Sequence, residues 1–182
     1  MSCGNSSNVM PVELLIRPLV VDDLAAYKAL RDEMLALHPE AFTPDAATQQ
    51  AKPAGSYAAR LGLEQGGGAQ FTLGAWRGGQ LVGAVSCERE ARLKTLHIGH
   101  LVGMMVRPEA RGQGAGRALV TACIARARQA RGLEMLTLSV TSGNLAALAL
   151  YEAAGFRRYG RMPRAMKLDG RYHDKDLMVL DL

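Results

Sequence analysis

The sequence predicts an α/β domain with a mixed, mostly antiparallel sheet and helices on both faces. The first observation behind this prediction is a pair of strand-like segments, residues 71–77 and 81–89. The Gly78-Gly79 pair between them is typical of a hairpin turn, so we expect the two strands to pair antiparallel.

The second observation lies in the middle of the chain. A helical pattern at 116–130 separates two strand-like runs, 97–106 and 135–140. Two strands joined through a helix lie parallel by a right-handed crossover. The sequence therefore predicts one parallel pair within an otherwise antiparallel sheet.

The N-terminal part supplies an edge strand and helices. Residues 12–17 form a short apolar run that Pro18 closes, which suits a strand at a sheet edge. A helix is expected to begin at Asp22 or Asp23, because apolar residues recur at helical spacing from there to residue 37. A second helix is predicted from Ser56 to about Glu64, before a glycine-rich surface loop.

The C-terminal part continues the alternation. Residues 144–154 form a helical pattern rich in small side chains, and Gly155 closes it. A strand is expected to begin at 156–159. Gly170 marks a turn before the last apolar run, 177–182.

Length and composition favour one soluble globular domain. The chain has 182 residues, of which 48% are hydrophobic and 21% charged, so we expect a single domain over 11–182 after a loose polar tail at 1–10. The net charge is +5, but the arginines are scattered and only 5% of residues are aromatic. A nucleic-acid partner is therefore not expected.

The cysteines and apolar segments bear on location. Cys3, Cys87 and Cys123 are odd in number and lack Cys-x-x-Cys spacing, so neither a disulfide framework nor a metal site is expected. No run approaches the roughly 18 apolar residues of a membrane span, and the first ten residues lack the apolar core of a secretory signal. We expect a cytoplasmic protein with no membrane partner.

The stretch 102–118 carries the chemistry. A strand-like run stops at Arg107-Pro108, and a basic loop with glycines, 111–116, opens directly into a helix. Such a loop points backbone N–H groups into one concavity, where the helix dipole adds partial positive charge. The sequence therefore predicts an anion site, most simply for phosphates.

The spacing of this loop excludes two familiar nucleotide motifs. A Walker loop needs a Lys after its glycines, and none follows here. A dinucleotide fingerprint counted from Gly112 needs a small residue where Arg117 stands.

Two separated motifs match another family. Arg111, Gly114 and Gly116 fit an Arg/Gln-x-x-Gly-x-Gly/Ala loop, with the lead-in Val106 and Pro108. Downstream stand Ser139-Val140, Asn144 and Tyr151-Glu152-x-x-Gly155-Phe156. Over residues 101–159 the chain thus resembles the GNAT superfamily of acetyl-CoA-dependent N-acetyltransferases.

This resemblance implies a GNAT-like sheet with a splayed central parallel strand pair, and a cofactor site within it. The backbone of Met105 and Val106 would meet the pantetheine arm and the acetyl group, and Asn144 would bond the pantetheine. An N-cap role for Asn144 is a compatible alternative. The residues that would hold the pyrophosphate form the loop Arg111, Gly112, Gln113, Gly114, Ala115 and Gly116.

The resemblance also implies two proton-transfer groups. Tyr151 would be the general acid toward the departing thiolate, or alternatively a core tyrosine. Relatives often carry a Glu base on the strand before the loop, where this chain has His97 and His100. His100 would share a strand face with Val106 if no bulge intervenes, although it could be only a half-exposed surface residue. Glu88 on the neighbouring strand is a third option.

The expected function is transfer of acetyl from acetyl-CoA, without a metal, to a primary amine of a small molecule such as an amino acid. The alternatives are a protein N-terminal or lysine acetyltransferase and a non-catalytic CoA-binding module. Residues 38–52 and 161–176 are expected to set the acceptor, although a solvated hairpin is an alternative for the second segment. Cys123 is expected to be a small side chain packed in the core. The family also implies a homodimer.

Overall fold

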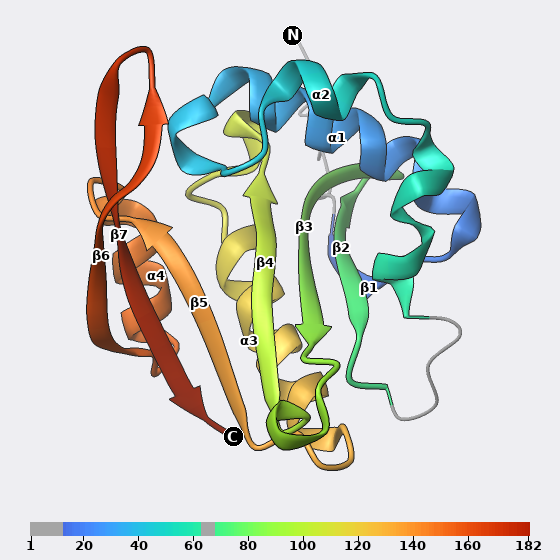
Figure 1. Ribbon diagram of the computed structural model, residues 1–182. Coiled ribbons are helices and arrows are strands. Elements are labelled where there is room, and N and C mark those ends of the chain that lie inside the picture. The colour runs from blue at the N-terminus through green and yellow to red at the C-terminus, as the bar shows by residue number, and fades with distance from the viewer. Residues whose placement is uncertain (1–12, 63–67) are drawn as a thin grey trace, which may run out of the picture.

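A computed structural model describes residues 13–62 and 68–182, and in this part of the chain seven strands form one sheet in the order β1-β2-β3-β4-β5-β7-β6 (Figure 1). The strands are β1 Leu14–Pro18, β2 Phe71–Arg77, β3 Gln80–Arg89, β4 Ile98–Val106, β5 Met135–Thr141, β6 Arg157–Leu168 and β7 Arg171–Asp181. The α-helices are α1 Leu24–Leu37, α2 Ala46–Gln50, α3 Ala115–Gln129 and α4 Leu145–Ala153. Short 3-10 helices cover Val21–Asp23, Pro39–Ala41, Ala54–Leu61, Leu93–Thr95 and Pro108–Ala110.

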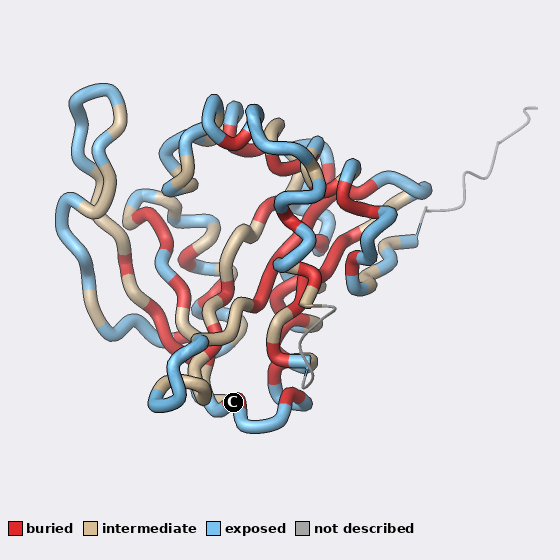
Figure 2. Tube along the Cα trace, turned by 45° about the vertical axis from the view of Figure 1, so that its right-hand side comes forward, coloured by how far each residue is buried: buried red, intermediate tan, exposed pale blue. Residues whose placement is uncertain are grey.

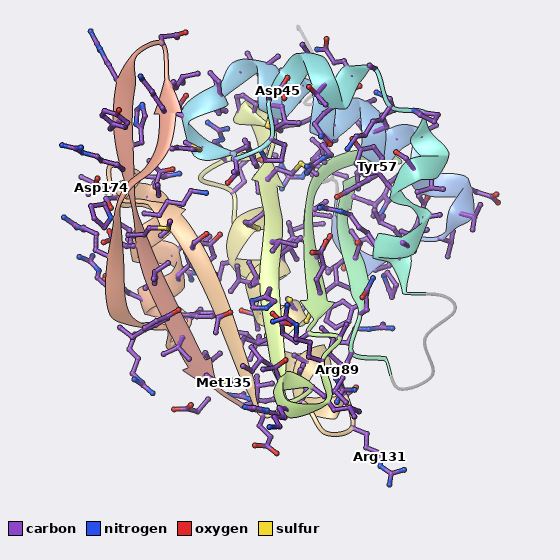
Figure 3. The ribbon with its side chains drawn as sticks, in the orientation of Figure 1. Asp45, Tyr57, Arg89, Arg131, Met135 and Asp174 are labelled. Carbon is purple, nitrogen blue, oxygen red and sulfur yellow. The ribbon has the colours of Figure 1, made fainter. Side chains whose placement is uncertain are left out.

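The central strands β4 and β5 form the one parallel pair in this sheet, and they separate along their length. Their pairing comprises only Ile98 with Met135, Gly99 with Leu136 and His100 with Thr137. Beyond that point β4 continues to Val106 and β5 to Thr141 without pairing to each other. Arg89 and Met135 mark the paired end of the sheet in Figure 3. The predicted mixed sheet with a splayed parallel pair is confirmed.

A β-bulge interrupts β4 where the splay begins. Ala84 pairs with Met105 and Ser86 with Val102, so between these pairs one residue of β3, Val85, opposes two of β4, Gly103 and Met104. Gly103 lies at the extra position with φ +60°, which favours glycine. Because side chains alternate across a strand, the extra residue reverses the alternation beyond it.

The bulge changes which residues share a face of β4. Met105 belongs to the core under α1, whereas Met104 and Val106 pack toward α3 and α4. His100 lies on the α1 side and does not share a face with Val106. The expected common face, which required an unbroken strand, is therefore wrong.

Two apolar clusters hold helices to opposite faces of the sheet. One packs α3 and α4 against the sheet through Leu119, Val120, Cys123 and Tyr151. The other packs α1 and the 3-10 helix Ala54–Leu61 against the opposite face. Figure 2 shows the buried segments concentrated along the central strands between these layers. Helices cover both faces, as predicted.

Some element boundaries differ from the sequence expectation. The helix expected from Ser56 is the 3-10 helix Ala54–Leu61, and the predicted tail at 1–10 lies outside the described residues. The short helix α2 was not expected; its N-cap Asp45 accepts a hydrogen bond from Thr48 N at 2.8 Å. Strands β6 and β7 extend well beyond the predicted runs. Sequence analysis missed their outer halves, because the residues there are exposed or half-buried and carry no alternating apolar signal.

No helix within residues 13–62 and 68–182 is long and apolar enough to cross a membrane.

Candidate functional site

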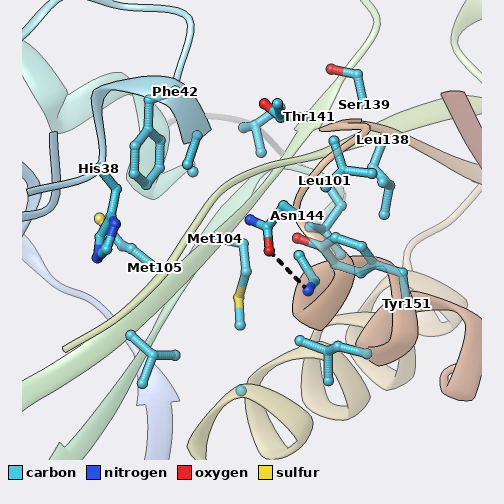
Figure 4. A pocket seen from close by; sticks show the side chains of 18 of the residues that line it. His38, Phe42, Leu101, Met104, Met105, Leu138, Ser139, Thr141, Asn144 and Tyr151 are labelled. Carbon is cyan, nitrogen blue, oxygen red and sulfur yellow. Dashed lines mark hydrogen bonds between the residues drawn. The ribbon is translucent and has the colours of Figure 1, made fainter. Parts of the chain in front are cut away.

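A cavity of about 1470 Å³ occupies the space where β4 and β5 part. On one side it reaches the loop before α3 and the helix α4; on the other it reaches α1 and the segment that follows it. Figure 4 shows Met104 on β4 facing Asn144 and Tyr151, with His38 and Phe42 across the strand. The cavity therefore passes through the sheet from one helical layer to the other.

The loop before α3 presents free backbone donors at one end of this cavity. In the described structure, the amides of residues 112–117 donate to no backbone carbonyl, and the helical ladder begins with Ala118 N to Gly114 O at 2.9 Å. Gly112 and Gly114 have φ +70° and +85°, and a Cβ at either would meet nothing within 4 Å. Gly112, Gly114 and Gly116 line the cavity, so this loop brings backbone amides without a carbonyl partner to its edge, as a phosphate site requires.

The side chains of this loop have different roles. Arg111 Nε donates to Val106 O at 3.1 Å, and Arg111 Nη2 lies 2.8 Å from His38 Nε2, so this side chain bridges the cavity to the end of α1. Gln113 does not line the cavity, because Arg77 and Glu109 O hold its amide. Ala115 is buried, so only its backbone can serve a ligand.

Helix α4 places an amide and a phenol at the middle of the cavity. Asn144 is the N-cap of α4, accepting from Ala147 N at 3.1 Å, and its side chain also lines the cavity. Tyr151 is 6% exposed and packs edge-on against Phe156 with ring centroids 5.9 Å apart. Burial, and secondarily Cys123, raises the pKa of the Tyr151 phenol, so it stays protonated at neutral pH.

The splayed part of β4 has a free backbone edge between these two groups. Met105 and Val106 pair with β3 on one side, and no strand pairs with them on the β5 side, although Val106 O accepts from Arg111 Nε. Gly116 on α3 comes close, since a Cβ there would lie 3.4 Å from Met104 Cε. An extended ligand arm could therefore take the place of the missing strand partner.

His100 lies at the vertex of the splay, in the last β4–β5 pair. Its Nδ1 is 2.7 Å from Thr137 Oγ1, and its Nε2 is 2.8 Å from Glu90 Oε1. The hydrogen bond to His100 lowers the pKa of the Glu90 carboxyl. Both ring nitrogens thus have partners, so a proton from the acceptor reaches the ring by relay through one of these partners or after one of these bonds is exchanged.

The other candidate bases are placed differently. His97 does not line the cavity. Glu88 does, and its Oε1 lies 3.3 Å from Arg60 Nε. The structure therefore brings His100 and Glu88 to the site but not His97.

Sequence reasoning missed three arginines that line the cavity: Arg117 in the first turn of α3, and two on the α1 side of the sheet. Arg31 on α1 and Arg60 at the end of the 3-10 helix both line it. A signal for Arg31 was present, because it falls within the apolar stripe of α1 beside Tyr27 and Leu30. A charge inside such a stripe is unusual enough to indicate a function.

The expected acceptor regions are only partly at the cavity. From the first, residues 38 and 40–44 line it; from the second, only His173 and Lys175 do. Arg164 and Lys167 instead lie over the Tyr172 ring, 5.1 and 5.3 Å from its centroid, in the β6–β7 hairpin. Most of the charged hairpin thus follows the solvated alternative.

The two described cysteines are core residues. Cys87 and Cys123 are fully buried and free, and burial raises the pKa of both thiols, that of Cys87 to about 12. They stay protonated at neutral pH and are poor nucleophiles. Within the described ranges, no group of three or more His, Cys, Asp or Glu side chains could hold a metal ion.

Comparison with known proteins assigns the family. The model of the acetyltransferase (GNAT) family matches residues 27–156. A mycothiol acetyltransferase from Salinispora tropica is 36% identical over 143 residues, which are 79% of this chain and 43% of the relative. An L-methionine sulfoximine/L-methionine sulfone acetyltransferase from Pseudomonas paraeruginosa is 40% identical over 77 residues, 42% of this chain and 44% of that protein.

Solved structures agree. The crystal structure of a GNAT-family acetyltransferase from Streptococcus pneumoniae superposes with a TM-score of 0.85 at 26% identity, covering 93% of this chain and all of that one. The chain spans less than half the length of the two curated relatives above. The family model nevertheless matches more than half of this chain, so the chain belongs to the GNAT acetyltransferase family.

Proposed function

We propose that this chain transfers the acetyl group of acetyl-CoA to the primary amine of a small molecule such as an amino acid. The observation that carries the proposal is one cavity with free amides of residues 112–117 at one end and a gap between β4 and β5 in its middle. The amides suit the diphosphate of coenzyme A, and the free edge of β4 suits its pantetheine arm. Relatives named for mycothiol and for methionine sulfoximine support a small-molecule acceptor.

The proposed reaction forms a C–N bond between the amine and the acetyl carbon and breaks the C–S bond of the thioester. Two protons move: one leaves the attacking amine, and one is delivered to the thiolate. Tyr151 is the proposed donor to sulfur, because its buried phenol keeps its proton. Backbone N–H groups on the free edge of β4 are the proposed partners of the developing oxyanion.

His100 is the proposed base, acting through Thr137. In the neutral imidazole one nitrogen carries a proton and the other accepts. Glu90 favours the proton on Nε2, which leaves Nδ1 to accept from the Thr137 hydroxyl. A proton from the amine can then pass to the hydroxyl oxygen while the hydroxyl proton passes to Nδ1.

An acceptor screen with thiol release as the readout tests the function. The panel contains amino acids, methionine sulfone and methionine sulfoximine, polyamines, aminoglycosides and short peptides, and mass spectrometry verifies an acetylated product. Turnover with a small amine, lost in Arg111→Glu, supports the proposal. Turnover with peptides alone makes the chain a protein acetyltransferase, and coenzyme A binding in calorimetry without any turnover makes it a binding module. The homodimer stays a prediction, to be tested by light scattering.

A further inference from the structure

Arg31 is a buried guanidinium without a counter-charge. It is 3% exposed, and its Nε is buried without a hydrogen-bond partner. No carboxylate within residues 13–62 and 68–182 forms an ion pair with it. A buried charge without a partner is costly, so a ligand that supplies one is favoured here.

The guanidinium lies over one aromatic ring and borders the cavity. Its Cζ lies 5.5 Å from the centroid of the Tyr57 ring, a cation–π contact that positions the group without neutralising it. Tyr57 belongs to the helical layer that packs beside α1 (Figure 3). Arg31 itself lines the cavity, so its free donors face a space that a small molecule can enter.

A second guanidinium converges on the same space at the β4 bulge. A Cβ at Gly103 would lie 3.7 Å from Arg31 Nη1 and 3.4 Å from Arg60 Nη1. The bulge therefore puts a residue without a side chain opposite both groups. Gly103 lies beyond the last β4–β5 pair at His100, in the splayed part of the strand.

The charges around this space favour a monoanion. Arg60 already has Glu88 as its partner at 3.3 Å, and its Nη1 also contacts the Tyr27 hydroxyl at 3.4 Å. Two guanidinium groups and one carboxylate leave a single positive charge. One carboxylate balances it and matches the donors of arginine in geometry.

We infer that Arg31 binds a carboxylate of the acceptor, so the acceptor is an amino-acid-like molecule whose amine and carboxylate lie close together. The inference rests on the proposed function and names the group that selects its substrate. The site lies on the α1 side of the sheet, opposite the α3 layer that begins with the phosphate loop. The carboxylate is thereby held apart from the coenzyme A phosphates.

Matched acceptors test the inference. Each amino acid, with L-methionine sulfone among them, is compared with its own carboxamide, which keeps the amine and the side chain but has no negative charge. The native protein is expected to prefer the acid. In Arg31→Gln, kcat/KM for the acid should fall about 10- to 100-fold, while the amide and the KM for acetyl-CoA stay nearly unchanged. Arg31→Lys should restore part of the preference.

Arg126→Gln is the matched control. Arg126 also has a buried Nε without a hydrogen-bond partner and also lies over an aromatic ring, 4.9 Å from the centroid of Phe71. It is on α3 and does not line the cavity. Its replacement should lower the stability of the protein without changing the ratio of kcat/KM for the acid to kcat/KM for the amide. Gly103→Ala is a second variant, which keeps the Arg31 side chain and adds a Cβ 3.7 Å from its Nη1. It also strains the backbone at φ +60°, so it should lower both the stability and the preference for the acid.

Several outcomes would overturn the inference. Equal loss for acid and amide would make Arg31 a structural residue, and a raised KM for acetyl-CoA would assign it to the coenzyme. Equal kcat/KM values of the native protein for the acid and its carboxamide would show that it has no carboxylate site. If no amine in the panel leads to thiol release from acetyl-CoA, the proposed function is wrong, whatever the role of Arg31. Calorimetry of methionine sulfone and its amide on the coenzyme A complex then still tests Arg31, since equal binding of the two rejects it.

Discussion

Tyr151 packs as a core aromatic residue and also lines the cavity, so its ring and its hydroxyl have separable roles. The ring lies against Phe156 and closes the core under α4. The hydroxyl is the proposed donor to sulfur. The two interpretations that the sequence left open are therefore compatible, and only a change confined to the hydroxyl separates their effects.

Tyr151→Phe should lower kcat about 100-fold or more at saturating acetyl-CoA, because it removes a proton donor. The ring remains, so the thermal midpoint should change little. Steady-state kinetics and a thermal melt on the same preparation measure both. An unchanged kcat would leave Tyr151 as a core residue only.

His100→Gln should lower kcat by a similar factor, because the proposed base is gone. Glutamine keeps one hydrogen-bonding group near Thr137 or Glu90, which limits structural change. Glu88→Gln serves as the comparison and should retain most of kcat in the same steady-state assay. The reverse pattern would move the role of base to Glu88.

At the residue scale, the sequence motifs led to side chains that lie at one cavity. Arg111, Asn144 and Tyr151 all line it, and their chemical roles stay predictions. The placement of His100 relative to Val106 failed, because one inserted residue at Gly103 reverses the side-chain alternation and no local pattern announces it. Arg31 was missed although it interrupts the apolar stripe of α1, because that pattern does not reveal whether the guanidinium has a partner in the folded chain.

The phosphate loop depends on backbone conformation at the start of α3. Gly114→Ala puts a side chain at φ +85°, which should cost about 1–2 kcal/mol of stability. It should also raise the KM for acetyl-CoA about tenfold, because the amides would move away from the positions in which they bind the diphosphate.

The control for this change is Gly170→Ala in the β6–β7 turn, where φ is +78° and the added Cβ is equally unobstructed. It should cost similar stability in urea unfolding without affecting the KM. Equal KM values for both variants would remove the loop from cofactor binding.

Asp176 joins β7 to β6 through charge. Its carboxylate is fully buried and accepts from Arg161 Nε at 2.8 Å, with Arg158 Nη1 3.6 Å away. The hydrogen bond from Arg161 lowers the pKa of Asp176. A carboxyl with a lowered pKa stabilises the fold above the ordinary pKa near 4, and this contribution is lost as pH falls through the folded value.

Asp176→Asn should therefore lower the free energy of unfolding by about 1–3 kcal/mol at pH 7, and by less near pH 3. Urea unfolding at the two pH values measures the difference. Asp181→Asn is the control, because its ion pair with Arg157 is exposed on both sides and should contribute at most about 1 kcal/mol. An equal effect of Asp176→Asn at both pH values would exclude the charge as its cause.

Elements with strong periodicity were predictable, and exposed ones were not. The β2–β3 hairpin and the β4–α3–β5 crossover follow from turn residues and apolar spacing, and both are present. The outer halves of β6 and β7 hold together mainly by backbone pairing and charge. Such strands leave no apolar pattern for sequence analysis to detect.

Ligand binding should be visible in the stability of the whole molecule. Coenzyme A at about 100 times its Kd should stabilise the protein by about 2.7 kcal/mol, which corresponds to a rise of roughly 5–11 °C in Tm for a chain of this size. Pantetheine, which lacks the diphosphate, should produce a much smaller shift in the same thermal melt. Equal shifts would argue against a phosphate site at residues 112–117.

At the outer margin of the sheet, β6 bears on how the protein behaves at high concentration. Its free edge offers backbone groups that an identical edge on a second molecule could pair with. Pro163 withholds one amide there, and β6 has four exposed arginines and no acidic residue, although Arg157, Arg158 and Arg161 have carboxylate partners on β7. The positive charge that remains on β6 opposes edge-to-edge aggregation, and this protection weakens as added salt screens the charges.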